Sequence, residues 1–335
     1  MRTALNEMFA IKHPILLAPM GNVSGGALAA AVSNAGGLGL IGAGYGNREW
    51  LTRELENAGE ARVGVGFITW SLARNRSLLD LALDQGPAAI MFSFGDYAPF
   101  LPAVRNAGVK IIWQVQTLAQ AREAAQAGVD LIVAQGTEAG GHGGARSTLT
   151  LVPAVVDAVA PLPVVAAGGI ADGRGLAAAH MLGAAGVLIG TRFFASEEAL
   201  GHPNAKRFMV DSHGDATVRT RVFDIVRGYP WPADVTGRVP LNRFFSALWH
   251  GREAGLSADI ARQQMIYQMA EEEGDTDTAV VFAGEVVDLI NTIEPAAKIV
   301  ESIAREADDL LSAEPASARE RAGSHPCRST SDRHE

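Results

Sequence analysis

The sequence predicts an α/β protein folded as a TIM (β/α)8 barrel, with a smaller, mostly helical lid subdomain inserted late in the chain. Between Pro14 and about Ala195, short apolar runs alternate with longer segments rich in Ala and Leu, as expected of strands that are each followed by a crossover helix. The runs recur at intervals of roughly 20 to 25 residues, which suits a βα unit. Glycines such as Gly108 and Gly128 stand where a helix C-cap is expected before the next run.

Eight of the apolar runs are predicted to be strands. A run such as Val-Val-Ala-Ala is apolar without interruption, which is typical of parallel strands that are covered on both faces. Eight consecutive βα units favour closure of the sheet into a barrel. In chain order the runs are Ile15–Ala18, Leu38–Ile41, Val63–Phe67, Ala89–Phe92, Lys110–Val115, Leu131–Ala134, Pro163–Ala167 and Val187–Ile189.

The alternation of runs ends near residue 195. The next stretch mixes polar, aromatic, Pro and Gly residues, so we expect a helical lid or substrate subdomain there. Val280–Ile290 and Ala296–Leu311 are each apolar on one side, which predicts helices that return to the barrel wall. The last residues are rich in Ser, Arg, Glu and Pro, which is typical of disorder. The expected division is a barrel in residues 1–195, a lid in 196–276, C-terminal helices in 277–313 and a disordered tail in 314–335.

Composition favours a small-molecule enzyme over a nucleic-acid or membrane protein. There are 28 Lys and Arg residues against 37 Asp and Glu, a formal net charge of -9, so no broad basic surface for nucleic acid or anionic lipid is expected. No signal peptide and no apolar stretch long enough for a transmembrane helix is present, so we expect a cytoplasmic location. The single cysteine, Cys327, excludes an intrachain disulfide, and no Cys/His cluster has the spacing of a metal site.

The strongest candidate for catalysis is His142, in the segment Ala134-Gln-Gly-Thr-Glu-Ala-Gly-Gly-His-Gly-Gly144. This segment follows the sixth predicted strand, so it belongs at the catalytic rim of a barrel. Gly140, Gly141 and their neighbours let the backbone approach a flat ring closely, since no Cβ intervenes. An imidazole in that place can exchange a proton near neutral pH. The alternative is a flexible turn with a surface histidine, but its position at a strand end favours the catalytic role.

Two further glycine-containing segments follow the seventh and eighth predicted strands. They are Ala166-Ala-Gly-Gly-Ile-Ala-Asp172 and Leu188-Ile-Gly-Thr-Arg-Phe193. Amide groups of such loops commonly bind a phosphate at the rim of a barrel. Gly168, Gly169, Gly190 and Thr191 are therefore candidate phosphate ligands. Glycine pairs after strands can also be plain tight turns, but two in adjacent units favour the phosphate site.

Two more groups at strand ends are candidates for contact with a cofactor ring. Ala18-Pro19-Met20 ends the first strand, and would place rigid backbone and a soft thioether against an apolar ring system. Pro19 could equally do no more than end the strand, with Met20 in the core. Gln114 and Gln135 end the fifth and sixth strands, where their amides could bond the polar edge of a cofactor or only the protein backbone.

In this order along the chain, these segments resemble the nitronate monooxygenase (2-nitropropane dioxygenase-like) family of flavin barrels. The resemblance runs from PILLAPM through AVSNAGGLGLIGAGY, AQGTEAGGHGG, AAGGIADGRGLAAA and GTRF, and continues more loosely into the lid. It implies non-covalent FMN and places the family's catalytic histidine at His142. The residues then expected to contact FMN are Ala18, Pro19, Met20, Gln114, Gln135, Gly140, Gly141, Gly168, Gly169, Leu188, Ile189, Gly190 and Thr191.

One residue departs from the pattern of that family. Relatives often carry Asn after the third strand, where this sequence has Gly66. One side-chain contact to the flavin is therefore expected to be missing, and substrate handling is expected to differ.

The resemblance implies oxidation of alkyl nitronates, and of nitroalkanes, by O2 to carbonyl compounds and nitrite. His142 would take the α-proton of a nitroalkane or stabilise the nitronate anion. Flavin reductases that use NAD(P)H, such as enoyl-acyl carrier protein reductases and quinone reductases, share the fold and are the alternative. A third possibility is a flavin-binding protein without turnover. No protein partner is indicated, although a homodimer is compatible with the sequence.

Overall fold

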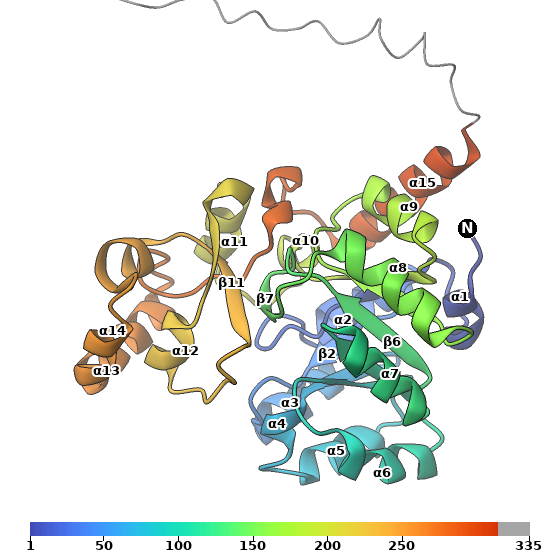
Figure 1. Ribbon diagram of the computed structural model, residues 1–335, viewed down its shortest axis with the longest axis horizontal. Helices are drawn as coiled ribbons and strands as arrows, with labels where there is room; N and C mark the ends of the chain where they lie inside the picture. The colour runs from blue at the N-terminus through green and yellow to red at the C-terminus, as the bar shows by residue number, and fades with distance from the viewer. Residues whose placement is uncertain (314–335) are drawn as a thin grey trace, which may run out of the picture.

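The computed structural model describes residues 1–313, and its centre is a barrel of eight parallel strands (Figure 1). Neighbouring strands pair in the order β1-β9-β8-β6-β5-β4-β3-β2, and a bridge between Leu16 and Leu38 joins the two ends of the sheet. The predicted barrel and its eight strands are confirmed. The strands are β1 Ile15–Leu17, β2 Leu40–Gly42, β3 Gly64–Ile68, β4 Ala89–Ser93, β5 Lys110–Val115, β6 Leu131–Gln135, β8 Val164–Ala167 and β9 Gly186–Ile189.

Helices connect successive strands and cover the outside of the barrel. A short helix, α1 Ala4–Phe9, precedes β1, and its Leu5 and Phe9 pack into the apolar interior at the amino ends of the strands. The helices between strands are α2 Gly26–Asn34, α3 Arg48–Asn57, α4 Thr69–Leu72, α5 Ser77–Leu83, α6 Leu101–Asn106, α7 Leu118–Gln126, α8 Thr148–Val159 and α9 Gly173–Met181. After β9 comes the short α10 Thr191–Phe194.

Side chains of each strand alternate between two apolar layers. Ile112 and Val133 belong to the cluster inside the barrel, whereas Ile111 and Ile132 belong to the cluster between strands and helices. This alternation follows from the two-residue period of a strand. It also sets the direction of polar side chains at the carboxyl ends, because Gln114 and Gln135 follow Ile112 and Val133 by two residues and point inward.

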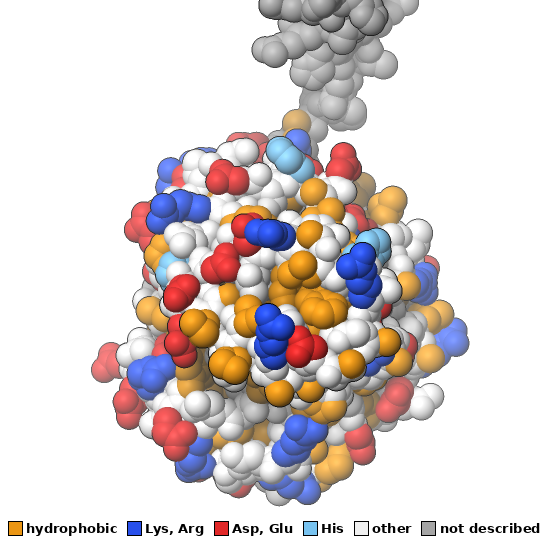
Figure 2. Space-filling view, turned by 90° about the vertical axis from the view of Figure 1, so that its left-hand side faces the viewer, with side chains coloured by type: hydrophobic (Ala, Val, Ile, Leu, Met, Phe, Trp, Pro, Cys, Tyr) orange, Lys and Arg blue, Asp and Glu red, His pale blue; other side chains and the backbone are white. Residues whose placement is uncertain are grey.

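The segment after residue 195 is largely helical and lies beside the barrel (Figure 1). Its β10 Thr217–Thr220 and β11 Thr236–Pro240 form an antiparallel sheet with β7 Gly141–Gly143 of the rim. We did not predict this sheet, because its strands are short and lack apolar alternation. The helices are α11 Pro203–Val210, α12 Val222–Arg227, a π-helix Phe244–Trp249, α13 Glu253–Ala258 and α14 Ile260–Glu273. Figure 2 shows apolar side chains on the outer face of this segment, where α14 exposes Met265, Ile266 and Met269.

The C-terminal part of the described chain returns to the barrel. Helix α15 Ala296–Ser312 packs on α9 and α2, which confirms the helix predicted over Ala296–Leu311. The helix predicted over Val280–Ile290 is wrong, because only Glu285–Leu289 is helical, as a 3-10 helix. Residues 280–284 have no regular secondary structure, and the Glu285 amide donates to the carbonyl of Glu138 in the rim. The tail predicted over residues 314–335 lies outside the described residues.

No membrane span is found in the described part of the chain. Within residues 1–313, none of the helices combines the length and the apolar character that crossing a bilayer requires.

Candidate active site

His142 lies at the centre of β7, where the loop after β6 meets the lid strand β11. Its Nε2 is 2.8 Å from Oδ1 of Asp224 on α12, and both side chains are buried. The indole of Trp231 stacks on the imidazole at a centroid distance of 3.6 Å and an interplanar angle of 6°. The catalytic candidate is thus held by a carboxylate at one edge and an aromatic face on one side.

Burial and neighbouring charges set the protonation of His142. Burial lowers the pKa of His142 below its ordinary value of 6.5, and the hydrogen bond and negative charge of Asp224 oppose that shift. The positive charges of Arg227 and Arg219 lower the pKa further. The imidazole is therefore neutral at neutral pH, as a general base must be.

Three buried glutamine side chains form a hydrogen-bonded group that reaches the backbone of His142 from inside the barrel. Nε2 of Gln135 donates to the carbonyl of His142 at 3.1 Å. Oε1 of Gln135 accepts from Gln114 at 3.1 Å and from Gln116 at 2.9 Å. Gln114 and Gln135 were predicted at this rim, whereas Gln116 was missed. Its signal was the two-residue spacing from Gln114, which continues the inward side of β5 one residue beyond the end of the strand at Val115.

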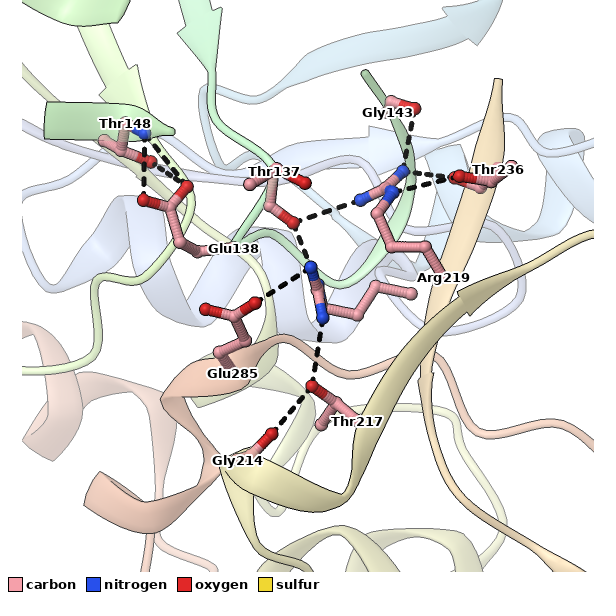
Figure 3. Close-up of polar contacts among 10 residues, drawn as sticks. Thr137, Glu138, Gly143, Thr148, Gly214, Thr217, Arg219, Thr236 and Glu285 are labelled. Atoms are coloured by element: carbon pink, nitrogen blue, oxygen red, sulfur yellow. Dashed lines mark hydrogen bonds and ion pairs between the residues drawn. The ribbon is translucent and has the colours of Figure 1, made fainter. Parts of the chain in front are cut away.

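Two lid arginines hold the rim loop between β6 and β7 (Figure 3). Arg219 donates to the carbonyls of Thr137, Gly143 and Thr236. Arg238 donates to Thr137 O at 2.8 Å and pairs with Glu285 at 2.8 Å. Charged donors from the lid thus satisfy the carbonyl oxygens of Thr137 and Gly143. They attach to the lid both the loop that leads to His142 and the strand β7 that contains it. Neither arginine was predicted.

The glycines after β8 and β9 present free backbone donors at the same rim. Gly168 and Gly169 have φ of +103° and +72°, which favours glycine. Within residues 1–313, the amides of Gly168, Gly169 and Gly190 donate no hydrogen bond. Gly190 precedes Thr191, whose Oγ1 accepts from the Gly284 amide at 3.1 Å and keeps its own proton available.

The loop after β6 lies directly against these glycines. A Cβ added to Gly168 would be 3.0 Å from the Gly136 carbonyl and 3.1 Å from the Ala139 amide, both in the loop that leads to His142. In the same loop, Glu138 accepts from the amide and hydroxyl of Thr148 (Figure 3). The histidine and the glycine loops are therefore parts of one rim.

Some of the remaining predicted residues face that rim, and others are packed away from it. Met20 and Ala18 lie against Gly190, at 3.4 and 3.5 Å from a Cβ added there. Gly140 packs closely on Ala283 and Gly284, whereas a side chain at Gly141 would meet open space. Leu188 points into the barrel, but Ile189 belongs to the layer between strands and helices, so only its backbone faces the rim.

A family model covers almost all of the described chain. The model described as nitronate monooxygenase matches residues 2–62 and 63–306. The chain belongs to the nitronate monooxygenase family. The family resemblance stated from the sequence is therefore confirmed.

Individual relatives of the chain are named for different activities. Nitronate monooxygenase npaC of Metarhizium robertsii is 34% identical, over 90% of this chain and 92% of the relative. A Rhodococcus jostii relative named (3aS,4S,5R,7aS)-5-hydroxy-7a-methyl-1-oxo-octahydro-1H-indene-4-carboxyl-CoA dehydrogenase is 31% identical, over 92% of this chain and 96% of the relative. The solved structure of FabK from Thermotoga maritima has a TM-score of 0.81 at 32% identity, and covers 93% of this chain and 97% of its own.

Gly66, the departure noted above from the pattern of the nitronate monooxygenase family, has a local physical reason. A Cβ at this position would collide with the ring of Pro19, which folds over the top of the barrel. Pro19 and Met20 also pack on Gly42, where a Cβ would be 2.6 Å from the Met20 carbonyl. In this member of the family, the ring of Pro19 after β1 occupies the space that a longer side chain on β3 would need.

The lid supplies functional candidates that the sequence did not single out. Asp224 and Arg227 are three residues apart on α12 and share one face of that helix. They lie in a short helix with no motif of its own, so only the fold reveals their proximity to His142. Within residues 1–313, no group of three or more His, Cys, Asp or Glu side chains is placed to hold a metal ion.

Proposed function

We propose that this protein is an FMN-dependent oxidoreductase that converts alkyl nitronates, with O2, to carbonyl compounds and nitrite. Membership of the nitronate monooxygenase family and the activity for which the Metarhizium relative is named support the proposal. The observation that carries it is the buried His142–Asp224 pair, 2.8 Å apart, on a rim whose glycine loops expose unpaired amides. The sequence predicted the histidine and the loops, and the acid that orients the histidine comes from the lid.

The donors at the rim fit the phosphate of FMN. The free amides of Gly168, Gly169 and Gly190, with the Thr191 hydroxyl, would bind phosphate oxygens. Ala18, Pro19, Met20, Gln135 and Gly140 would then lie along the ring, as the family resemblance implies. Bound FMN would supply the electron transfer, which no side chain of the protein can perform.

His142 would handle the proton of the substrate. A carboxylate at Nε2 fixes the tautomer in which Nε2 carries the proton, so Nδ1 is the free base. Because Trp231 covers the imidazole face, a nitroalkane would present its α-proton to Nδ1 in the plane of the ring. The protonated imidazole would then lie beside the nitronate anion and stabilise its charge.

Reduction of a different substrate with NAD(P)H is the second candidate. FabK from Thermotoga maritima is similar to this chain over a comparable length, and the Rhodococcus relative, named as a dehydrogenase, shows that relatives of this chain act on substrates other than nitronates. Fold alone does not separate the two activities, because function depends on the site.

Anaerobic bleaching of the bound flavin distinguishes the two candidates. We expect propane-2-nitronate to bleach the protein, and NADH and NADPH to leave it yellow. The His142→Ala variant should keep its flavin and lose turnover of nitroalkane by about 10² or more, the scale of a lost general base. His180→Ala, which removes an exposed histidine on α9, serves as the control. Bleaching by NAD(P)H but not by nitronate would refute the proposal.

A further inference from the structure

Arg227 is the second functional candidate on α12. It follows Asp224 by three residues, and Gly228 ends the helix directly after it with φ of +72°. Asp224 is already bonded to His142. The helix therefore carries the acid that orients the base and a cation on the same face.

The guanidinium of Arg227 is buried without a full set of partners. Its side chain is 12% exposed, and its Nη1 has no hydrogen-bond partner among the described residues. Its nearest carboxylate is Glu271, whose Oε1 lies 3.9 Å from Nε and is itself half-exposed. A buried N–H that donates to nothing is unfavourable, so the site is incomplete without an acceptor.

Aromatic rings surround the unpaired N–H. The guanidinium carbon lies 4.8 Å from the centroid of Tyr229, 5.5 Å from Tyr45 and 5.7 Å from Phe282. Phe282 in turn lies 5.3 Å from the ring of His142. The rings hold the cation through cation–π contacts but supply no acceptor for Nη1.

A second unpaired donor borders the same aromatic cluster. Nε1 of Trp70 is buried and has no partner among the described residues. The ring of Trp70 lies 5.9 Å from Tyr45 and 5.4 Å from Trp231. Two unpaired donors around one set of rings fit a ligand that brings oxygen acceptors and a flat, delocalised structure.

We propose that Arg227 binds the anionic group of the substrate, and that this group is a planar, delocalised oxyanion such as the O–N–O of a nitronate. A planar guanidinium matches two coplanar oxygens through parallel N–H bonds. A cation in this place also favours the nitronate over its neutral conjugate acid, so it assists proton removal by His142. That the anion is a nitronate rests on the proposed function. That it is a planar anion rests on the surroundings of Arg227 alone.

Nitrate is the probe that tests this assignment without turnover. It is a planar oxyanion with the same O–N–O geometry, and its binding to the flavin-loaded protein can be followed by tryptophan fluorescence or by the flavin spectrum. Arg227→Met should weaken nitrate binding at least tenfold, and Arg227→Lys should weaken it less. Arg262→Met, which removes an exposed arginine from α14, is the matched control and should bind nitrate as the unaltered protein does.

Substrate pairs give a second readout that a purely structural role would not produce. Propane-2-nitronate and 2-nitropropane share one carbon skeleton and differ in charge. Arg227→Met should raise KM for the nitronate at least tenfold and leave KM for the neutral compound within about twofold. An equal effect on both substrates, or unchanged nitrate binding, would overturn the proposal.

The unaltered protein provides a test that does not depend on the folding of a variant. Nitrate should compete with propane-2-nitronate, whereas acetone, a neutral planar molecule, should not. Lack of competition by nitrate would also overturn the proposal. If the protein turned over no nitronate, but nitrate binding still required Arg227, the proposed function would fail while the anion site would stand.

Discussion

Two opposing influences act on the pKa of the buried imidazole of His142. Burial favours the neutral form, and the Asp224 carboxylate favours the protonated form. Burial is the larger influence, so the pKa lies below 6.5. The same carboxylate fixes which nitrogen is free, so its position matters as much as its charge.

The pH dependence of kcat/KM for a nitroalkane tests this balance. We expect full activity at neutral pH, where the imidazole is unprotonated, and a fall in acid with an apparent pKa below 6.5. Asp224→Asn should move the acid limb to still lower pH, because the contribution that raises the pKa of His142 is lost. It should also reduce kcat at least about tenfold, since the tautomer is no longer fixed. An acid limb above 6.5 in the unaltered protein would contradict this account.

The replacement Gly66→Ala tests the close packing of Pro19 on β3. The added methyl group would collide with the Pro19 ring, so we expect a loss of about 2 kcal/mol in the free energy of unfolding, typical of overpacking. Denaturant unfolding measures it. Gly255→Ala is the control, because its methyl group meets only an ordinary contact at 3.5 Å within a helix. Equal free energies of unfolding for the two variants would contradict close packing of Pro19 on Gly66.

At the scale of elements, the site is built from loops that end neighbouring parallel strands. The loops after β1, β6, β8 and β9 meet at one rim because their strands are adjacent in the sheet. This convergence brings glycines that are distant in sequence to one rim, as the proposed cofactor site requires.

The replacement Gly168→Val tests the rim loops as a cofactor site. Its side chain would meet Thr148 and the loop that leads to His142, so we expect protein that purifies with little or no flavin. The ratio of flavin absorbance to protein absorbance measures the loss. Gly86→Val is the control, because Gly86 also has a positive φ but no neighbour within 4 Å. A yellow Gly168→Val protein would refute the phosphate role of this loop.

Predictability of the elements depended on the length and regularity of each apolar pattern. The eight barrel strands are apolar throughout and evenly spaced, so the sequence alone predicted them. Strand β7 has the sequence Gly-His-Gly and pairs only with the lid, so no local pattern marked it. The apolar residues of Val280–Ile290 are buried against the rim. In the sequence they resembled the apolar face of a helix, although only Glu285–Leu289 is helical.

At the scale of the whole molecule, the lid and the barrel together form the candidate active site. His142 and the glycine loops belong to the barrel, whereas Asp224, Arg227 and Trp231 belong to the lid. The sequence predicted the barrel half, since strand ends identify its rim. It could not predict the lid half, because the contact of α12 with β7 depends on tertiary packing alone.

Equilibrium titration of flavin-free protein with FMN and with riboflavin is the most direct test of the central claim, that one rim binds a phosphate-bearing flavin beside His142. The account predicts one FMN per chain, and riboflavin binding at least about tenfold weaker, because hydrogen bonds to a charged group contribute about 1.5–3 kcal/mol each. Protein that stays colourless in excess FMN would contradict the claim, as would equal affinity for the two flavins.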